Sequence, residues 1–329
     1  MAKLNLTLAC WDYDRTRGLM DRVQPEGIDL NYLPMAVEET FFRMLRHREF
    51  DVAELSLSSY CVSLTRAEKP FIALPVFPSR FFRHSSIYIS AKSKIREPKD
   101  LIGKRIGTPE YQMTAPVWIR GILADDYGVP VDAVTYVTGG EETPGRDEKL
   151  KLDLPARIKI ERAPAGKTLS GMLRTGEIDA LHTARAPSCF SDGSGDARRL
   201  FEDFQSVERT YFKRTGIFPI MHVIVLRRDV YERHRWVAQT LTQAFREAQA
   251  LAYAELEETA ALKVMLPWLT AHVEETRREM GRDFWAYGLE ANRTVLETFL
   301  RYHHEQGLSP HKLELEALFA PEALESFTI

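Results

Sequence analysis

The chain has 329 residues, more than one hydrophobic core usually serves, so two lobes or domains are expected. Hydrophobic residues make up 44% of the chain and charged residues 28%, which is ordinary for a soluble globular protein. The net charge is −3 and the 44 Lys and Arg residues are spread along the chain, which argues against nucleic acid as the main partner. No stretch approaches the ~18 uninterrupted apolar residues of a membrane span.

Three cysteines, Cys10, Cys61 and Cys189, are widely spaced and form no CxxC or zinc-binding pattern. Isolated thiols in odd number are most simply explained as free thiols in a reducing compartment. The apolar stretch at the N-terminus is too short for a signal peptide, and charges follow it directly. The sequence therefore predicts a cytoplasmic protein.

The first predicted element is an alternating strand at residues 4–9, which leads into a dense group of hydrogen-bonding side chains at residues 11–16. Asp12, Asp14 and Arg15 belong to this group and are candidate site residues. The alternative is a capped turn in which Asp12 or Asp14 is the N-cap of the following helix. The elements predicted next are a strand and an amphipathic helix, at residues 27–33 and 37–48.

Residues 50–64, FDVAELSLSSYCVSL, read as a buried strand that runs directly into a helix. Ser56, Ser58 and Ser59 are N-cap residue types at the change of polarity. A helix N-terminus presents free backbone N–H groups, so this stretch predicts an anion site with Ser56 and Ser58 as ligands. The alternative is an ordinary β–α corner with a well-capped end.

A second copy of this pattern follows later in the chain: residues 44–52 reappear as residues 172–180. In this register Glu54 corresponds to His182, and Arg185 aligns with a leucine of the first copy. Two similar α/β units favour two lobes whose strand ends line a cleft between them. Glu54 and His182 are therefore both expected to face that cleft.

The segment RFFRH connects predicted strands at residues 71–77 and 85–90. Its Arg80, Arg83 and His84 suit a planar anion, because guanidinium groups hold carboxylates bidentately and aromatic faces stack on a ring. The alternative is a set of surface charges beside phenylalanines that are packed in the core.

A polar segment at residues 93–103 is predicted to cross into the second lobe, where a helix follows at residues 115–127. Thr114 is the expected N-cap of this helix. Tyr111, Gln112 and Thr114 thus lie at the mouth of a second strand-to-helix corner and are candidates for substrate binding.

Residues 138–162 are rich in Gly, Pro and charge and read as an exposed loop or excursion that gives no information about the chemistry. Residues 216–226 form a strand that returns the chain to the first lobe, and a single long helix follows at residues 231–258. His222 lies inside this apolar strand, where a core histidine is the alternative to a functional one.

This order of elements resembles the type II periplasmic-binding-protein fold, a two-lobed α/β fold with a ligand cleft and here a helical C-terminal region. One lobe would comprise residues 1–92 with residues 222–329, and the other residues 93–221. Within that fold the chain resembles the 4,5-dihydroxyphthalate decarboxylases over nearly its whole length. The resemblance is carried by four segments: LTLACWDYDRT (6–16), VEETFFRMLRHREFDVAELSLSSY (37–60), FPSRFFRHSSIYI (77–89) and RTGIFPIMHVIVLRRDVYERH (214–234).

The resemblance implies a carboxy-lyase that removes CO2 from a small aromatic dicarboxylate and yields protocatechuate. Each carboxylate of this substrate is para to one hydroxyl, so protonation of the ring carbon that bears the carboxylate is best stabilised by the para oxygen as phenolate. The enzyme then needs a carboxylate clamp, a proton donor and a group that takes or polarises the phenol proton.

The chemistry assigns candidate residues to these roles. The clamp candidates are Arg80, Arg83 and Arg185, with Ser56, Ser58, Tyr111, Gln112, Thr114 and Arg15 as further binding residues. The donor candidates are His182, His222 and His84, of which His182 is preferred because it ends a strand. Asp12 and Asp14 would take the phenol proton or orient a histidine. No organic cofactor is expected, and no ligand spacing demands a metal, although a divalent ion on the catechol oxygens stays open.

Two rival functions remain at this point. One is a solute-binding protein for a small aromatic or sulfonate anion, since many proteins of this fold only bind. The other is an enzyme of the same fold that acts on a different substrate. The absence of a leader peptide and the number of proton-transfer groups favour an enzyme. A homo-oligomer is compatible with the sequence, whereas membrane and nucleic-acid partners are not expected.

Overall fold

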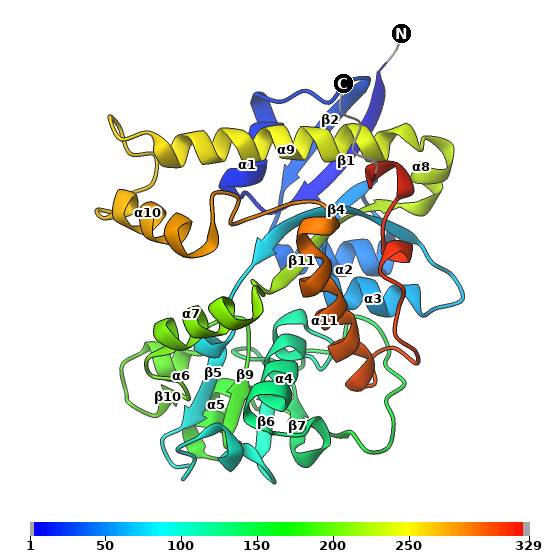
Figure 1. Ribbon diagram of the computed structural model, residues 1–329. Coiled ribbons are helices and arrows are strands. Elements are labelled where there is room, and N and C mark those ends of the chain that lie inside the picture. Colours follow the sequence, from blue (N-terminus) through cyan, green and yellow to red (C-terminus); the bar gives the residue numbers. More distant parts are fainter. Residues whose placement is uncertain (1–2, 325–329) are drawn as a thin grey trace.

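The computed structural model describes residues 3–324, which form two α/β lobes (Figure 1). The first lobe is built on a five-stranded sheet with the order β2–β1–β3–β11–β4. Its strands are β1 (Leu4–Cys10), β2 (Ile28–Pro34), β3 (Val52–Ser56), β4 (Phe71–Arg80) and β11 (Ile220–Arg227). Its helices are α1 (Asp14–Asp21), α2 (Val37–His47), α3 (Leu57–Leu64), α8 (Arg228–Arg233), α9 (Trp236–Glu257), α10 (Leu269–Met280) and α11 (Arg293–Glu305).

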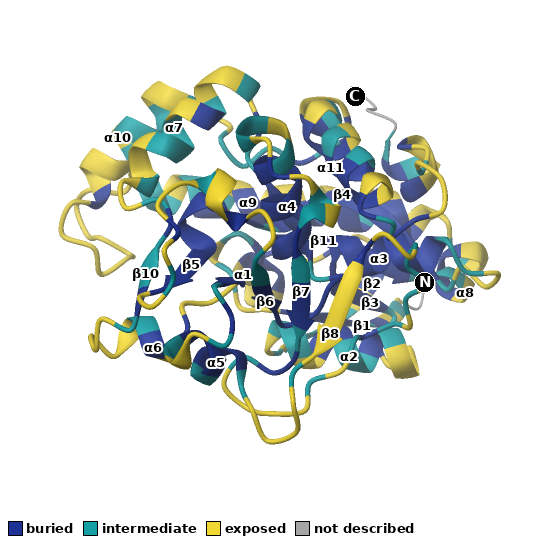
Figure 2. Cartoon of the chain, turned by 90° about the horizontal axis from the view of Figure 1, so that it is seen from below, coloured by how far each residue is buried: buried dark blue, intermediate teal, exposed yellow. Residues whose placement is uncertain are grey.

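The second lobe is built on a six-stranded sheet with the order β10–β5–β9–β6–β7–β8. Its strands are β5 (Ile87–Ser90), β6 (Arg105–Thr108), β7 (Thr135–Thr138), β8 (Lys159–Arg162), β9 (Ala180–His182) and β10 (Ala197–Arg199). Its helices are α4 (Thr114–Tyr127), α5 (Leu169–Thr175), α6 (Ser188–Ser191) and α7 (Phe204–Thr215). Buried strands fill the middle of this sheet, whereas β8 is an exposed edge strand (Figure 2).

The position of β11 decides the geometry of the site. This strand inserts antiparallel between β3 and β4, so that His222 pairs with Ser56 and Ile224 with Glu54. A segment more than 160 residues distant in sequence is thereby placed beside β3. The residues after His222, from Val223 to Leu226, are fully buried on both faces of the strand, so β11 is a central strand of this sheet.

The first crossing between the lobes lies earlier than residues 93–103. β5 pairs with β9 and β10 in the second sheet, so the chain crosses at residues 81–86. All four β5 residues are buried. The lobe to which this strand belongs is set by its pairing in the second sheet and not by the polarity of the segment that follows it. The chain returns at residues 216–219, just before β11 begins at Ile220.

Several local predictions differ from the structure. Tyr13, not Asp12 or Asp14, is the N-cap of α1, and Met113, not Thr114, is the N-cap of α4. The single long helix predicted at residues 231–258 is two helices, α8 and α9, separated at His234 and Arg235. No helix among residues 3–324 is long and apolar enough to cross a membrane.

Candidate active site

A cavity of about 330 Å³ lies between the two lobes. Its volume is at the lower end of the roughly 300–1,000 Å³ found for small-molecule sites, and such sites occur where strand ends of α/β sheets meet. Both lobes contribute to its wall, which is formed by Trp11, Tyr13, Ala36, Val37, Glu38, Phe41, Ser56, Arg83, Met113, Thr114, Ala115, Lys149, Ala184, Arg185, Met221 and His222.

Glu54 is a carboxylate fully buried in β3, directly behind this cavity wall. Its Oε2 accepts hydrogen bonds from the Trp11 amide at 3.0 Å and the Cys10 thiol at 3.6 Å, and its Oε1 accepts one from the Tyr13 hydroxyl at 2.7 Å. His222 Nδ1 lies 2.6 Å from Oε1. Burial opposes ionisation, but His222 and the other donors outweigh it and lower the pKa of Glu54. Glu54 is therefore an anion inside the protein.

His222 presents its ring to the cavity, and its side chain is 17% exposed. Its Nδ1 faces Glu54, and the edge of its ring meets the Phe41 ring at a centroid distance of 4.9 Å. Nε2 has no hydrogen-bond partner among the described residues. A buried carboxylate at Nδ1 fixes the orientation of the ring and leaves Nε2 free to exchange a proton with a ligand in the cavity.

The Glu54 carboxylate predicts a pH dependence of stability that Glu54→Gln removes. The folded-state pKa lies below the usual value of 4.5, so the contribution is complete above that value and is lost as the pH falls through the folded pKa. We expect the Tm of wild type to exceed that of Glu54→Gln at about pH 6, and the gap to narrow towards about pH 3. Thermal unfolding at a series of pH values measures this gap, and a gap independent of pH would contradict the assignment.

His182 does not face the cleft, contrary to the prediction. Along β9, Leu181 packs into the small core of the second lobe with α5, so His182 points with Ala180 to the opposite face, which α4 covers. Neither of its ring nitrogens has a hydrogen-bond partner in the described structure. Burial, with a contribution from Arg120, lowers the pKa of His182 to about 3. It is a neutral core histidine.

His84 is also a core residue. Its ring lies in an aromatic cluster with Tyr127, Phe201 and Tyr211, at centroid distances of 5.2–6.3 Å. Burial, together with Arg214, lowers its pKa to about 4. Of the three donor candidates, only His222 reaches the cavity.

Arg83 lies in the cavity wall as a guanidinium without a carboxylate partner among residues 3–324. Its Nε donates to the Met221 sulfur at 3.1 Å, and its Nη1 makes only long contacts of 3.4 Å with the Ser86 hydroxyl and the Ala184 carbonyl. Burial lowers its pKa to about 9. A buried cation so weakly satisfied is suited to an anionic ligand.

Arg80, a second of the three predicted carboxylate ligands, has a structural role instead. Its guanidinium donates to the carbonyls of Phe218 and Ala286 and to the Asn292 side chain, so it joins β4 to the C-terminal region. Arg185 does line the cavity, but its side chain is 65% exposed and pairs with Glu38 on α2 at 3.1 Å.

The group at residues 11–16 faces away from the cavity except for Trp11 and Tyr13. Asp12 pairs with Arg17 at the surface, and Asp14 pairs with Arg15. The Arg15 guanidinium lies between the Tyr13 and Trp285 rings, 4.2 Å from each centroid. Neither aspartate reaches His222, so the prediction that they take the phenol proton or orient a histidine is wrong.

The predicted anion site at the start of α3 is already filled by a side chain. Of the three candidate serines, Ser56 is the N-cap. The Thr114 hydroxyl from the second lobe contacts Ser56 Oγ at 2.8 Å and accepts the Ser58 N–H at 3.0 Å. Ser56 and Thr114 line the cavity, and Ser58 does not. Tyr111 and Gln112 are buried away from it: the Tyr111 hydroxyl donates to the Gln306 carbonyl, and the Gln112 amide to Glu148 and the Leu150 carbonyl.

Sequence reasoning placed Glu54 at the cleft but gave it no chemical role, and it missed Glu38 and Lys149 altogether. A carboxylate in the otherwise apolar strand VAELS was the available signal for Glu54. Lys149 belongs to the loop at residues 138–162, which was predicted to be uninformative, yet it lines the cavity. Its composition gave no sign of this, because only the tertiary structure folds the loop back against residues 110–112.

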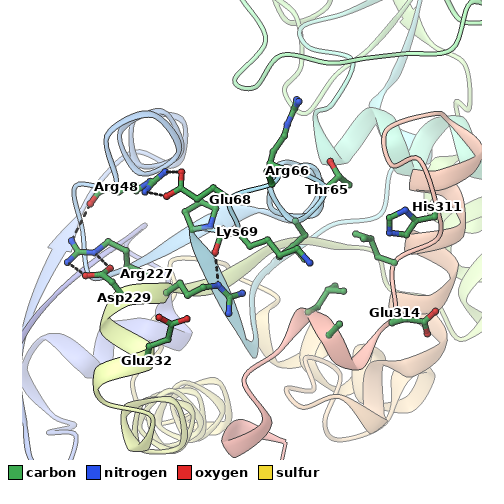
Figure 3. Close-up of a pocket in the computed structure, with 17 residues that line it drawn as sticks. Arg48, Thr65, Arg66, Glu68, Lys69, Arg227, Asp229, Glu232, His311 and Glu314 are labelled. Atoms are coloured by element: carbon green, nitrogen blue, oxygen red, sulfur yellow. Dashed lines mark hydrogen bonds and ion pairs between the residues drawn. The ribbon is translucent and has the colours of Figure 1, made fainter.

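A larger groove of about 1150 Å³ lies elsewhere, between residues 64–70, α8 and the segment that contains His311 and Glu314 (Figure 3). Two ion pairs lie in its wall, Arg48 with Glu68 and Arg227 with Asp229. It contains no buried acid–base pair. The interlobe cavity is therefore the better candidate for an active site.

No protein-family model matches the chain. The structure resembles the aliphatic sulfonate-binding protein SsuA from Escherichia coli, with a TM-score of 0.55 and 14% identity over 98% of this chain and 99% of that chain. A sulfonate-binding protein from Methylobacillus flagellatus KT gives a TM-score of 0.56 and 14% identity, with coverage of 98% and 93%. At this identity the likeness concerns the fold alone, and it confirms the predicted two-lobed periplasmic-binding-protein-like fold.

Curated proteins give a closer likeness. The 4,5-dihydroxyphthalate decarboxylase from Comamonas testosteroni is 45% identical over 330 residues, which cover 100% of both chains. The protein of the same name from Pseudomonas putida is 49% identical over 214 residues, which cover 65% of this chain and 83% of that protein. Likeness at this level over the full length confirms the resemblance seen in the sequence. The chain belongs to the 4,5-dihydroxyphthalate decarboxylase family.

Proposed function

We propose that this protein decarboxylates 4,5-dihydroxyphthalate to protocatechuate, with the Glu54–His222 pair as its acid catalyst. The observation that carries the proposal is a buried carboxylate 2.6 Å from the imidazole of a cavity-lining histidine. Binding an anion does not need such a pair, because fixed donors suffice for it. Proton delivery to carbon does need it.

The substrate carboxylates bind at Arg83, whose guanidinium supplies the positive charge that two neighbouring carboxylates require. The first turn of α4 contributes further, because Met113, Thr114 and Ala115 line the cavity at a helix N-terminus. Trp11, Tyr13 and Phe41 supply aromatic surface for the ring.

The chemical step begins with the His222 imidazolium, which Glu54 stabilises. Nε2–H gives its proton to the ring carbon that bears the carboxylate, and the electron pair for the new C–H bond comes from the ring, driven by the para oxygen as phenolate. The bond to the carboxylate carbon then breaks, CO2 leaves, and its electron pair restores the aromatic ring. Neutral His222 regains a proton from solvent, so one proton replaces one CO2.

The test is incubation of the purified protein with 4,5-dihydroxyphthalate, with the ultraviolet spectrum and CO2 release recorded together. In D2O the protocatechuate formed should carry one deuterium, at the carbon that lost CO2, which mass spectrometry and NMR detect. Unchanged substrate under these conditions would refute the proposed function.

The reaction as written uses the ring itself as electron sink, so we propose that it needs no organic cofactor and no metal. We expect exhaustive dialysis against EDTA to leave kcat unchanged, and subsequent addition of Mg²⁺, Mn²⁺ or Zn²⁺ to leave it unchanged as well. Activity that is lost on dialysis and restored by one of these ions would instead assign a metal to the catechol oxygens.

A further inference from the structure

In the proposed reaction, no residue has yet been assigned to stabilise the charge on the substrate's phenol oxygen. The ring oxygen para to the reacting carbon must carry negative charge when the carbon is protonated, and Asp12 and Asp14 do not face the cavity. Two buried cations line the cavity from different walls. Arg83 comes from the crossing between β4 and β5, whereas Lys149 comes from the loop after β7.

Lys149 is firmly held, and its side chain is only 3% exposed. Its amine bonds to Oε1 of Glu110, and its backbone N–H donates to Oε2 of the same carboxylate at 3.2 Å. Glu110 is fully buried and also accepts two hydrogen bonds from Arg146, at 2.6 and 2.8 Å. An ammonium has three N–H donors, so the bond to Glu110 leaves two for other partners.

The charges around Lys149 differ from those around Arg83. Arg146 and Arg185 both pair with Glu38, at 3.2 and 3.1 Å. In these ion pairs three cations, Arg146, Lys149 and Arg185, share two carboxylates, Glu110 and Glu38. Two further carboxylates lie near the cluster without an ion pair to it: Glu148 beside Glu110, and Glu141 near Arg185. Burial is the main cause that lowers the pKa of Lys149, and Glu110 only partly offsets it, so a further anionic partner stabilises its ammonium form.

Glu38 decides which part of the substrate suits this end of the cavity. It lines the cavity as an anion, because Arg146 and Arg185 lower its pKa despite the opposing effect of burial. A substrate carboxylate here would be repelled by Glu38. Arg83 forms no ion pair in the described structure, and the carboxylate nearest in effect to it, Glu208, does not line the cavity. A catechol with one ionised oxygen fits better, because it offers an anion to Lys149 and a hydroxyl donor to Glu38.

We propose that Lys149 is a further catalytic residue, which donates a hydrogen bond to the ring oxygen para to the reacting carbon and holds it as phenolate, while Glu38 accepts one from the neighbouring hydroxyl. This inference rests on the proposed function. The phenol O–H bond breaks and its proton passes to solvent water. The oxygen electron pair moves into the ring as His222 protonates the carbon, and it returns to the oxygen when CO2 leaves.

The experiment uses two ligands that do not react. Protocatechuate carries both hydroxyls and one carboxylate, and phthalate carries two carboxylates and no hydroxyl. Difference spectroscopy detects the red-shifted absorption of bound phenolate, and calorimetry gives the affinity of each ligand for wild type, Lys149→Met and Arg185→Met. Arg185→Met is the matched control, since it removes a more exposed cation from the same wall.

Wild type should bind protocatechuate as a phenolate near neutral pH. Lys149→Met should lose this absorption and bind protocatechuate roughly tenfold or more weakly, as expected for a charge-assisted hydrogen bond. Its affinity for phthalate should stay unchanged, and Arg185→Met should keep the phenolate absorption. If Lys149→Met does not fold because Glu110 loses a partner, the double variant Glu110→Gln/Lys149→Met removes both charges and serves the same comparison.

Equal losses for phthalate and protocatechuate in Lys149→Met would overturn the inference and make Lys149 a general anion ligand. Protocatechuate that binds wild type without phenolate absorption would overturn it as well. A wild-type protein that shows the phenolate absorption but releases no CO2 from 4,5-dihydroxyphthalate would support Lys149 as a catechol ligand while refuting the proposed function.

Discussion

Replacing His222 by asparagine is expected to lower kcat by ~100-fold or more, while the substrate still binds. Asparagine occupies a similar volume and keeps a polar group towards Glu54, but it cannot deliver a proton near neutral pH. The same assay in D2O should show a slowed wild-type step, since a proton moves to carbon in it. Steady-state kinetics, with calorimetry for binding, measure both effects.

The matched control is His182→Asn. This residue lies under α4 with no access to the cavity, so its replacement should leave kcat essentially unchanged even if it lowers the Tm. The assignment of His222 would be wrong if His222→Asn kept its kcat. A large loss of kcat in a folded His182→Asn variant would instead assign the proton-donor role to His182.

Replacing Arg83 by methionine is expected to weaken the binding of an aromatic ortho-dicarboxylate by ~2–4 kcal/mol, which corresponds to roughly 30- to 700-fold in Kd. The guanidinium is buried and has no carboxylate partner among the described residues, so a bound carboxylate pair would meet its full charge. Phthalate, with two carboxylates, should lose more affinity than benzoate, with one.

Calorimetry with these two ligands compares Arg83→Met with Arg185→Met. Arg185 is largely exposed and already paired with Glu38, so its replacement should cost much less affinity. Equal losses for phthalate and benzoate in Arg83→Met would show that Arg83 is not the site of the carboxylate pair.

Much of the fold could be predicted from the sequence because it depends on short-range patterns. The alternation in β1 and the strand-to-helix change at Ser56 match the structure to within one or two residues. The resemblance of long segments to a decarboxylase family pointed to the reaction as well. An N-cap depends only on its own turn of helix, and the sequence narrowed it to Ser56, Ser58 or Ser59, of which the structure has Ser56.

The candidate site was predicted less well. Residues of the same type can be structural or functional, and only long-range packing decides which. Arg80 and Arg83 stand three positions apart in one segment. Arg80 is bound by Ala286 and Asn292, more than 200 residues later in the chain, and is therefore structural. Arg83 has no carboxylate partner in the part of the chain that the structure describes and lines the cavity.

The two histidines show the same limit. His182 and His222 both lie in apolar strands, and local sequence cannot tell which face of a strand will be covered. The second sheet turns His182 beneath α4, while the insertion of β11 beside β3 brings His222 to Glu54, 168 residues away in sequence. The sequence by itself determined which elements form, whereas the pairing of distant strands decided which side chains meet, because only that pairing sets their register and burial.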